Sequence, residues 1–142
     1  MVPGQQVGWA RIPFQTEHAA MWHGSAASHI DMNPSGAGGS HLWATCGSAQ
    51  VGDANIGAGI VAGIWFGTPE SFVNLAAFLP GQWDRTYATS IVQQDGLYYV
   101  GGYGYPAAGG GPEAFYWVGV PAPGTGIGLL LGAPVLARRR RA

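Results

Sequence analysis

The sequence predicts an all-β protein built from four-stranded, blade-like units similar to those of β-propellers. Short segments such as 61–67 and 71–75 alternate apolar or small residues with others, and Gly, Pro, Asn or Ser bound them, which is typical of strands. A repeat of about 44 residues runs through the chain, which is the length of one propeller blade. Prolines interrupt nearly every window that could form an amphipathic helix, and a proline breaks a helix interior.

The repeat is defined by three copies of the pattern Ala-x-x-Trp-x-Gly, whose tryptophans are Trp22, Trp65 and Trp117. Further elements recur in the same order around them: Gln-Val-Gly or Tyr-Val-Gly at 6–8, 50–52 and 99–101, Ser-x-Ile/Val-Asp/Asn-Met/Leu at 28–32 and 71–75, and Ala-Thr at 44–45 and 88–89. Because the tryptophan recurs in every copy, we expect it to be a packing residue of the repeat core and not a ligand platform.

Each complete unit is predicted to hold four strands, which carry the Ala-Thr, Val-Gly, Trp and Ile-Asp-Met (or Val-Asn-Leu) elements in turn. The units fall at about 1–37, 38–80 and 81–119. The chain then holds about two and three-quarter units, whereas a closed propeller has roughly four to eight blades. It is either a truncated piece of a longer gene product, or closed by oligomerising, or an open array of sheets with exposed edges. Truncation would also explain an N-terminus without a recognisable signal peptide.

Charge is scarce and unevenly placed. Only 9% of residues are charged, lysine is absent, and four of the six basic residues lie at 138–141. The body before residue 120 has two arginines against seven acidic residues, so it lacks the basic face that nucleic-acid binding needs, and no nucleic-acid partner is expected. The single cysteine, Cys46, excludes an intrachain disulfide and multi-cysteine metal sites.

The last segment, 120–142, differs in composition and is expected to be a separate tail. It opens with Val120, Pro121, Ala122 and Pro123 and ends with Arg138, Arg139, Arg140 and Arg141. The apolar stretch 124–137 between them predicts a short apolar helix, although a comfortable membrane span needs ~20 residues. A basic cluster directly after an apolar run stops transfer across a membrane and leaves the C-terminus in the cytoplasm.

This order of elements resembles the PEP-CTERM sorting signal, also catalogued as the ice-binding protein C-terminal domain. The resemblance implies export, a tether in the inner membrane, processing near the Pro-x-Pro motif by an exosortase, and a final place at the cell surface or in the extracellular matrix. Ala122 stands where the family usually has Glu, so recognition of that carboxylate is in question. The alternative is that Val120–Pro123 is a stiff spacer before a membrane tail.

The repeat is also similar to propeller-type repeats, related to HAF repeats, that occur in exported PEP-CTERM proteins. The phrases that carry this likeness are residues 18–28 and Gln50-Val51-Gly52. A propeller is a scaffold, and a fold alone gives no activity. No catalytic residue and no cofactor are therefore predicted.

Three patterns that could hold a ligand carry less weight than their structural explanations. Residues 31–36 match the first half of a calcium loop, but Leu42 stands where a bidentate acid is needed,, so an Asx turn is preferred. His18, His23, His29 and His41 match no common spacing of zinc ligands,. Residues 57–62 read G-x-G-x-x-A, but no helix is predicted to follow for a dinucleotide to meet. No metal site is expected.

The remaining aromatic residues suggest a carbohydrate surface, for which we name Trp43, Trp83 and Tyr103 as possible contacts. Exposed rings stack on sugars while their polar edges bond hydroxyls, although packing between units is the preferred explanation. The sequence as a whole predicts an exported, non-catalytic repeat protein sorted to the envelope or the extracellular polymeric matrix. The alternatives are a carbohydrate-binding surface module, with extracellular polysaccharide as its partner, and less favoured, a metal-dependent enzyme.

Overall fold

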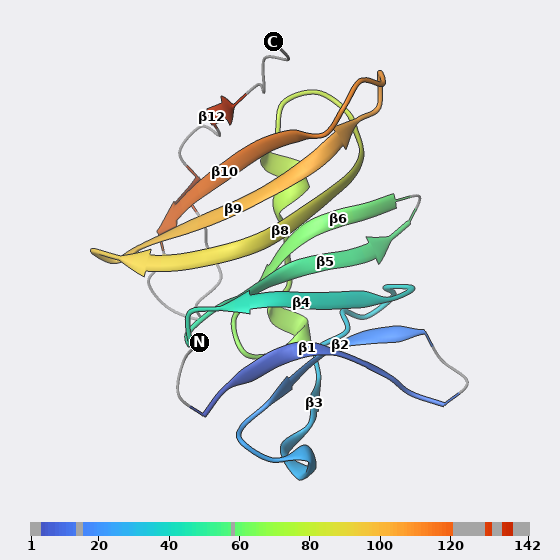
Figure 1. The fold of residues 1–142 in the computed structure, drawn as a ribbon, viewed down its shortest axis with the longest axis vertical. Coiled ribbons are helices and arrows are strands. Elements are labelled where there is room, and N and C mark those ends of the chain that lie inside the picture. Colours follow the sequence, from blue (N-terminus) through green and yellow to red (C-terminus); the bar gives the residue numbers. More distant parts are fainter. Residues whose placement is uncertain (1–3, 14–15, 58, 121–129, 132–134, 138–142) are drawn as a thin grey trace.

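The fold is seen in a computed structural model, in which residues 4–13, 16–57, 59–120, 130–131 and 135–137 are described. These residues form antiparallel meanders joined by short 3-10 turns, with no α-helix among them. The prediction of an all-β fold is confirmed. The strands lie one beyond the next from the N-terminal repeat to the C-terminal one (Figure 1).

The first repeat unit contains three strands. They are β1 (Gln6–Arg11), β2 (Glu17–Trp22) and, after the 3-10 turn η1 (Ala26–Ser28), β3 (Ile30–Asp31). β1 pairs with β2, and β2 with β3, all antiparallel. The described residues of this unit, 4–13 and 16–37, include no counterpart of the strand that opens each of the next two units.

The second unit has the four strands that the repeat predicts, in the predicted order. They are β4 (Ser40–Thr45), β5 (Gln50–Ile56), β6 (Gly59–Trp65) and β7 (Val73–Asn74), with the 3-10 turns η2 (Pro69–Ser71) and η3 (Leu75–Phe78) before and after β7. Each strand pairs antiparallel with the next. The unit is therefore a simple four-stranded meander.

The third unit consists of β8 (Trp83–Gln94), β9 (Leu97–Pro106) and β10 (Glu113–Val120). A single parallel bridge, between Ile60 and Arg85, joins β6 to β8 and so links the second and third units. The strand order β11-β10-β9-β8-β6-β5-β4, in which β11 is Leu130–Leu131, is open, and β1-β2-β3 form a separate sheet. No closed ring is formed by the described strands.

Two short segments of the predicted tail helix are described, and both are extended. β11 (Leu130–Leu131) and β12 (Val135–Ala137) pair antiparallel with β10. The rest of the stretch 124–137 lies outside the described residues, as do 121–123 and 138–142. In the described part of the chain no helix has the length and hydrophobicity needed to cross a membrane.

Two β-bulges correct the alignment of the third repeat. The pairing of β4 with β5 steps from Leu42 to Ala44, and the pairing of β8 with β9 steps from Ala88 to Ser90. The structural equivalent of Leu42 is therefore Ala88, so the predicted match of 44–45 with 88–89 is wrong by two residues. The third Val-Gly element shifts as well, because Val100 pairs with Trp117 in the way that Gln50 pairs with Trp65.

Glycines opposite the two bulges explain why the structure keeps this register. Gly52 lies against the carbonyl oxygen of His41, and Gly102 against that of Tyr87, so closely that an added Cβ would collide with either oxygen. Only glycine fits such a close backbone approach. The need for glycine falls on the strand that faces the bulge. Gly52 and Gly102 therefore occupy equivalent positions in the second and third units.

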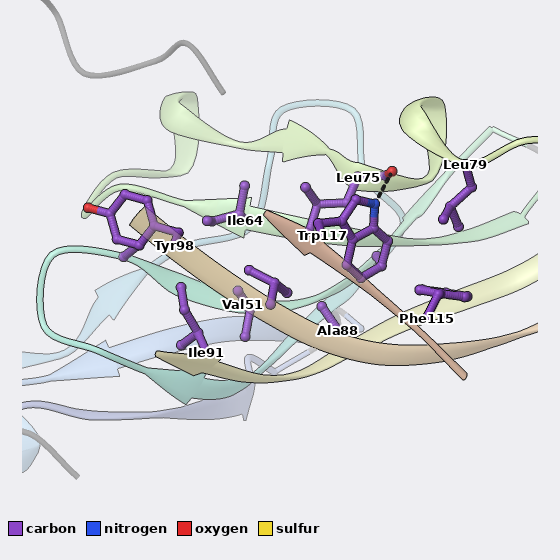
Figure 2. Close-up of a cluster of buried hydrophobic side chains, with 12 residues drawn as sticks. Val51, Ile64, Leu75, Leu79, Ala88, Ile91, Tyr98, Phe115 and Trp117 are labelled. Atoms are coloured by element: carbon purple, nitrogen blue, oxygen red, sulfur yellow. Dashed lines mark hydrogen bonds between the residues drawn. The ribbon is translucent and has the colours of Figure 1, made fainter. Parts of the chain in front are cut away.

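The hydrophobic core is divided between the two interfaces that join successive units. One cluster lies between the first and second units: Ala19, Met21, Met32, Leu42, Ala54 and Trp65. The larger cluster lies between the second and third units, and its members shown in Figure 2 include Val51, Ile64, Leu75, Tyr98, Phe115 and Trp117. Apolar faces are thus buried where successive units meet, as in repeat proteins.

The recurring tryptophan joins the second unit to the first and the third unit to the second. The Nε1–H of Trp65 donates to the carbonyl oxygen of Met32 at 2.9 Å. That of Trp117 donates to the carbonyl oxygen of Leu75 at 3.0 Å, as Figure 2 shows. Met32 and Leu75 occupy the same position of the repeat. Trp65 and Trp117 are fully buried, whereas Trp22 is partly buried.

Candidate functional site

A hollow lined by charged and polar side chains lies where the first unit meets the second. Its volume is about 440 Å³, and it is lined by Arg11, Thr16, Glu17, Gly39, His41, Asp53, Asn55 and Ile60. The lining residues come from the last residue of β1, the second half of β5 and the first residues of β2, β4 and β6, or lie directly before β2 and β4. The hollow therefore depends on how the units pack together and not on any one of them.

Strand pairing sets the positions of the charged side chains. Arg11 is directly opposite Glu17 across β1 and β2, and His41 is directly opposite Asp53 across β4 and β5. Opposite residues of an antiparallel pair project on the same side of the sheet. Packing of β4 against β1 and β2 then brings the two pairs together.

The imidazole of His41 bridges two carboxylates from different units. Its Nδ1 lies 3.0 Å from Oδ1 of Asp53, and its Nε2 lies 2.8 Å from Oε2 of Glu17. A carboxylate accepts hydrogen bonds and does not donate them, so both ring nitrogens act as donors and the ring is a cation. This charge-assisted pair of bonds ties the first unit to the second.

Both carboxylates have a second donor. The indole nitrogen of Trp43 donates to the other oxygen of Asp53 at 2.7 Å, and Arg11 donates to the other oxygen of Glu17 at 3.2 Å. Asp53 is only 3% exposed, and a buried carboxylate needs such partners to remain charged. The four charged groups form one hydrogen-bonded network with two positive and two negative charges.

The network shifts two pKa values in opposite directions. The hydrogen bond from His41 holds the pKa of the Glu17 carboxyl below its ordinary value, with Arg11 contributing in the same sense. Burial by itself would lower the pKa of His41, but its hydrogen bonds to Asp53 and Glu17 together raise it. The network therefore favours the charged forms of Glu17 and His41,.

Two exposed indole rings stand beside this network. Trp9 is 42% exposed and Trp43 is 46% exposed. Their ring centroids are 4.9 Å apart at an angle of 57°, and the ring centroids of His41 and Trp9 lie 5.0 Å apart in a T-shaped arrangement. Exposed aromatic rings next to fixed hydrogen-bonding groups can stack on an apolar ligand face while the polar groups bond its edge.

The three predicted carbohydrate contacts occupy three different places. Trp43 adjoins the hollow through Asp53. Trp83 is partly buried, packs edge-on against Phe115 at 5.3 Å and lines a different hollow. Tyr103 lies on the sheet of the third unit, where it stacks on Tyr87 at 5.1 Å. Of the three, only Trp43 belongs to the site described here.

The candidate ligand loop at 31–36 forms a hydrogen-bonded turn. Asp31 accepts from the backbone N–H of Asn33 at 2.9 Å, and its other oxygen meets His18 at 2.9 Å. Asn74 makes the same turn in the second unit, where it accepts from the N–H of Ala76 at 2.9 Å. This is the Asx turn that was preferred over a calcium loop.

Other candidate ligand patterns are placed apart. The segment 57–62 begins in the turn after β5 and continues as strand β6, so no helix follows its glycines. Within the ranges that the structure describes, no group of three or more His, Cys, Asp or Glu side chains could hold a metal ion. The carboxylates of the site are engaged by His41, Trp43 and Arg11 instead.

Sequence reasoning missed Trp9, Arg11, Glu17 and Asp53 as members of one site. Asp53 lies buried in β5, and sequence reasoning did not connect it with Glu17 or His41. A usable signal was present in the repeat itself: Trp9 and Asp53 follow the Gln-Val-Gly element at the same position. Residues of such different character at one repeat position indicate a site where the units diverge.

Only one residue of the predicted sorting elements lies among the described residues. Val120 ends β10, while Pro121, Ala122, Pro123 and the arginines at 138–141 lie outside the described residues. Comparison of the whole sequence with models of protein families, with curated proteins and with solved structures finds no match in any of the three.

Proposed function

We propose that this chain is a non-catalytic carbohydrate-binding repeat protein that acts outside the cytoplasm, with extracellular polysaccharide as its ligand. The observation that carries the proposal is the pair of exposed indoles, Trp9 and Trp43, beside the fixed network of Arg11, Glu17, His41 and Asp53. The indoles stack on the apolar face of a pyranose ring, and the network and Asn55 bond the hydroxyl groups at its edge.

The geometry favours binding over hydrolysis. Two catalytic carboxylates of a glycosidase must leave room between them for the sugar and, in inverting enzymes, a water. Here the imidazole of His41 fills the space between Glu17 and Asp53 with hydrogen bonds of 2.8 and 3.0 Å. Both ring nitrogens are donors, so His41 has no lone pair with which to act as a general base.

The wider proposal is that the repeats are propeller-type blades and that the tail sorts the protein to the envelope or matrix. The four-stranded meander of the second unit and the face-to-face packing of successive units support the first part. The order Val-Pro-Ala-Pro, apolar stretch and arginine cluster supports the second, with an apolar tail helix in the inner membrane and an exosortase as processing partner.

Affinity electrophoresis of the full chain through gels that contain neutral or acidic polysaccharides tests the binding proposal. We expect retardation by at least one polymer, and loss of most of it in Trp9→Ala and Trp43→Ala. The matched control is Phe78→Ala, which removes an exposed ring of similar size from the turn η3 and should leave retardation unchanged. Migration unaffected by every polymer would overturn the proposal.

Sorting is tested in a bacterial host that has an exosortase, with an export signal placed before the chain. We expect the exported protein to be shortened near Pro121, and a Pro121→Ala, Pro123→Ala double variant to keep its full length. A second variant, Ala122→Glu, should be processed at least as fast, because it restores the carboxylate that the family usually carries. Full-length wild-type protein in this host would contradict the sorting proposal.

A further inference from the structure

Each repeat unit has two different faces, and each internal interface joins one face of each kind. The tryptophan face carries the recurring tryptophan; in the second unit it includes Leu42, Ala54 and Trp65. The receiving face is the opposite side of the meander; in the first unit it includes Ala19 and Met21. The tryptophan face of the third unit covers the receiving face of the second unit in the same way.

The tryptophan face of the first unit is built like the buried ones. Strand register places Gln6, Gly8, Ala10, Ala20 and Trp22 on it, at the positions of Gln50, Gly52, Ala54, Gly63 and Trp65 in the second unit. The pair of aromatic rings on this face recurs as well. The ring centroids of Trp22 and His29 are 5.6 Å apart, and those of Trp65 and Phe72 are 4.8 Å apart. The side chain of Trp22 makes no hydrogen bond to any described residue, whereas its two counterparts do.

The receiving face of the third unit exposes several large hydrophobic side chains. Val92, Tyr99, Tyr103 and Tyr116 lie on it, and they are between 38% and 56% exposed. By strand register, Tyr99 is the equivalent of Ala49 and Tyr116 is the equivalent of Ile64. Ala49 and Ile64 are fully buried in the interface between the second and third units. Half of the large hydrophobic side chains exposed among the described residues thus gather on this one face.

We propose that the two end faces bind each other between two copies of this chain. The receiving face of the third unit in one copy packs on the tryptophan face of the first unit in the other, with the register of the two internal interfaces. The contact is heterologous, so it must repeat until a ring closes. Two copies supply about six units, which lies within the roughly four to eight blades of closed propellers, and we therefore assign a closed dimer.

The two internal interfaces indicate that the partner of each end face is a second copy of the chain. A tryptophan face and a receiving face fit each other at both internal interfaces, and one of each is left over, on opposite ends of the same chain. A second copy presents both missing faces at once. It would give Trp22 the main-chain acceptor that Trp65 and Trp117 find, and would cover Tyr99 and Tyr116.

The test uses light scattering on the full chain after size-exclusion chromatography, with two variants that each block one face. Tyr116→Arg blocks the receiving face, and Trp22→Arg blocks the tryptophan face; Ala10→Arg serves as a second variant of that face should Trp22→Arg fail to fold. We expect wild type and Phe78→Ala to have twice the mass of one chain, and each blocked variant to have the mass of one.

Mixing the two blocked variants is the decisive step. Each retains the face that the other lacks, so an equimolar mixture should return to the dimer mass through one intact interface. An interface that pairs identical faces could not be rescued in this way, and failure of the mixture to associate would overturn the proposal. Monomeric wild type at all concentrations, or variants that remain associated through their tails, would overturn it too. None of these outcomes depends on sugar binding.

Discussion

The backbone N–H of Gly67 donates to the side-chain oxygen of Gln50 at 2.9 Å, and this bond links two motifs that recur together in the sequence. Gln50 opens Gln-Val-Gly, and Gly67 closes Ala-x-x-Trp-x-Gly. The first unit has the same bond, from Gly24 to Gln6, also at 2.9 Å. In the third unit Val100 takes the place of the glutamine, so the bond is absent there.

Gln50→Ala should lower the free energy of unfolding by about 1–3 kcal/mol, because it removes a buried amide side chain and leaves the partly buried N–H of Gly67 without its acceptor,. Gln50 is fully buried, whereas Gln6 is exposed and water can replace its side chain. Gln6→Ala is therefore the matched control and should cost less than about 1 kcal/mol. Urea unfolding followed by tryptophan fluorescence measures both values. Equal losses in the two variants would contradict the role given to burial.

Trp65→Phe should destabilise the protein by about 1–3 kcal/mol, since it keeps most of the ring but leaves the carbonyl of Met32 without a donor. Trp117→Phe should behave alike through Leu75. Trp22→Phe is the control, because Trp22 makes no such bond within the described chain, and we expect a change within about 0.5 kcal/mol. The measurement is chemical denaturation with each variant at a low protein concentration. A Trp22 variant as damaged as the others would contradict the inter-unit role.

Gly52→Ala should prevent folding or cost more than about 3 kcal/mol, because the new methyl group would collide with the carbonyl oxygen of His41. Gly102→Ala should act in the same way against Tyr87. Gly8 is the equivalent glycine of the first unit, where an added Cβ would make an ordinary contact of 3.6 Å with the ring of Trp22. Gly8→Ala should therefore be tolerated. Thermal unfolding by circular dichroism distinguishes the three.

The stability of the protein should fall as the pH rises through the pKa of His41. That pKa is raised in the folded state, so the stabilisation from the imidazolium is complete below the ordinary value of about 6.5 and is lost above the folded value. Glu17 acts in the opposite sense, because its pKa is lowered and its contribution is lost as the pH falls through the folded value.

His41→Gln should remove the alkaline part of this dependence while His23→Gln, which changes an exposed histidine, should retain it. Urea midpoints between about pH 5 and pH 9 bracket the ordinary histidine pKa and give the comparison. If wild type and His41→Gln lost stability in parallel over this range, the ionised bridge between Glu17 and Asp53 would be refuted.

Much of the fold could be predicted because local patterns dictate it. Alternating residues and turn glycines marked the strands, and the recurring tryptophans marked the units, since both depend on contacts that repeat at short range. The predicted alignment of the third unit was wrong because the β-bulge opposite Gly102 shifts the pairing of β8 with β9. The residue that requires this bulge lies on the facing strand, so the Ala-Thr pair at 88–89 gives no sign of it.

The site was largely hidden from sequence analysis for a related reason. Trp43 was named because exposed rings are conspicuous, but Glu17 and Asp53 belong to different units and meet only through His41. Their contact depends on how two sheets pack face to face. A repeat position occupied by Trp9 in one unit and Asp53 in the next was the one feature that could have drawn attention to this surface.

The division of the core into two separate clusters also governs how such a protein can change its length over evolution. A duplicated unit brings its own tryptophan face and a new receiving face, so it covers one exposed surface and replaces it with another of the same kind. One type of interface between units is then enough to pack an array of any length. Lengthening or shortening the array needs no new core, and each unit remains free to alter exposed residues such as Trp9 and Trp43.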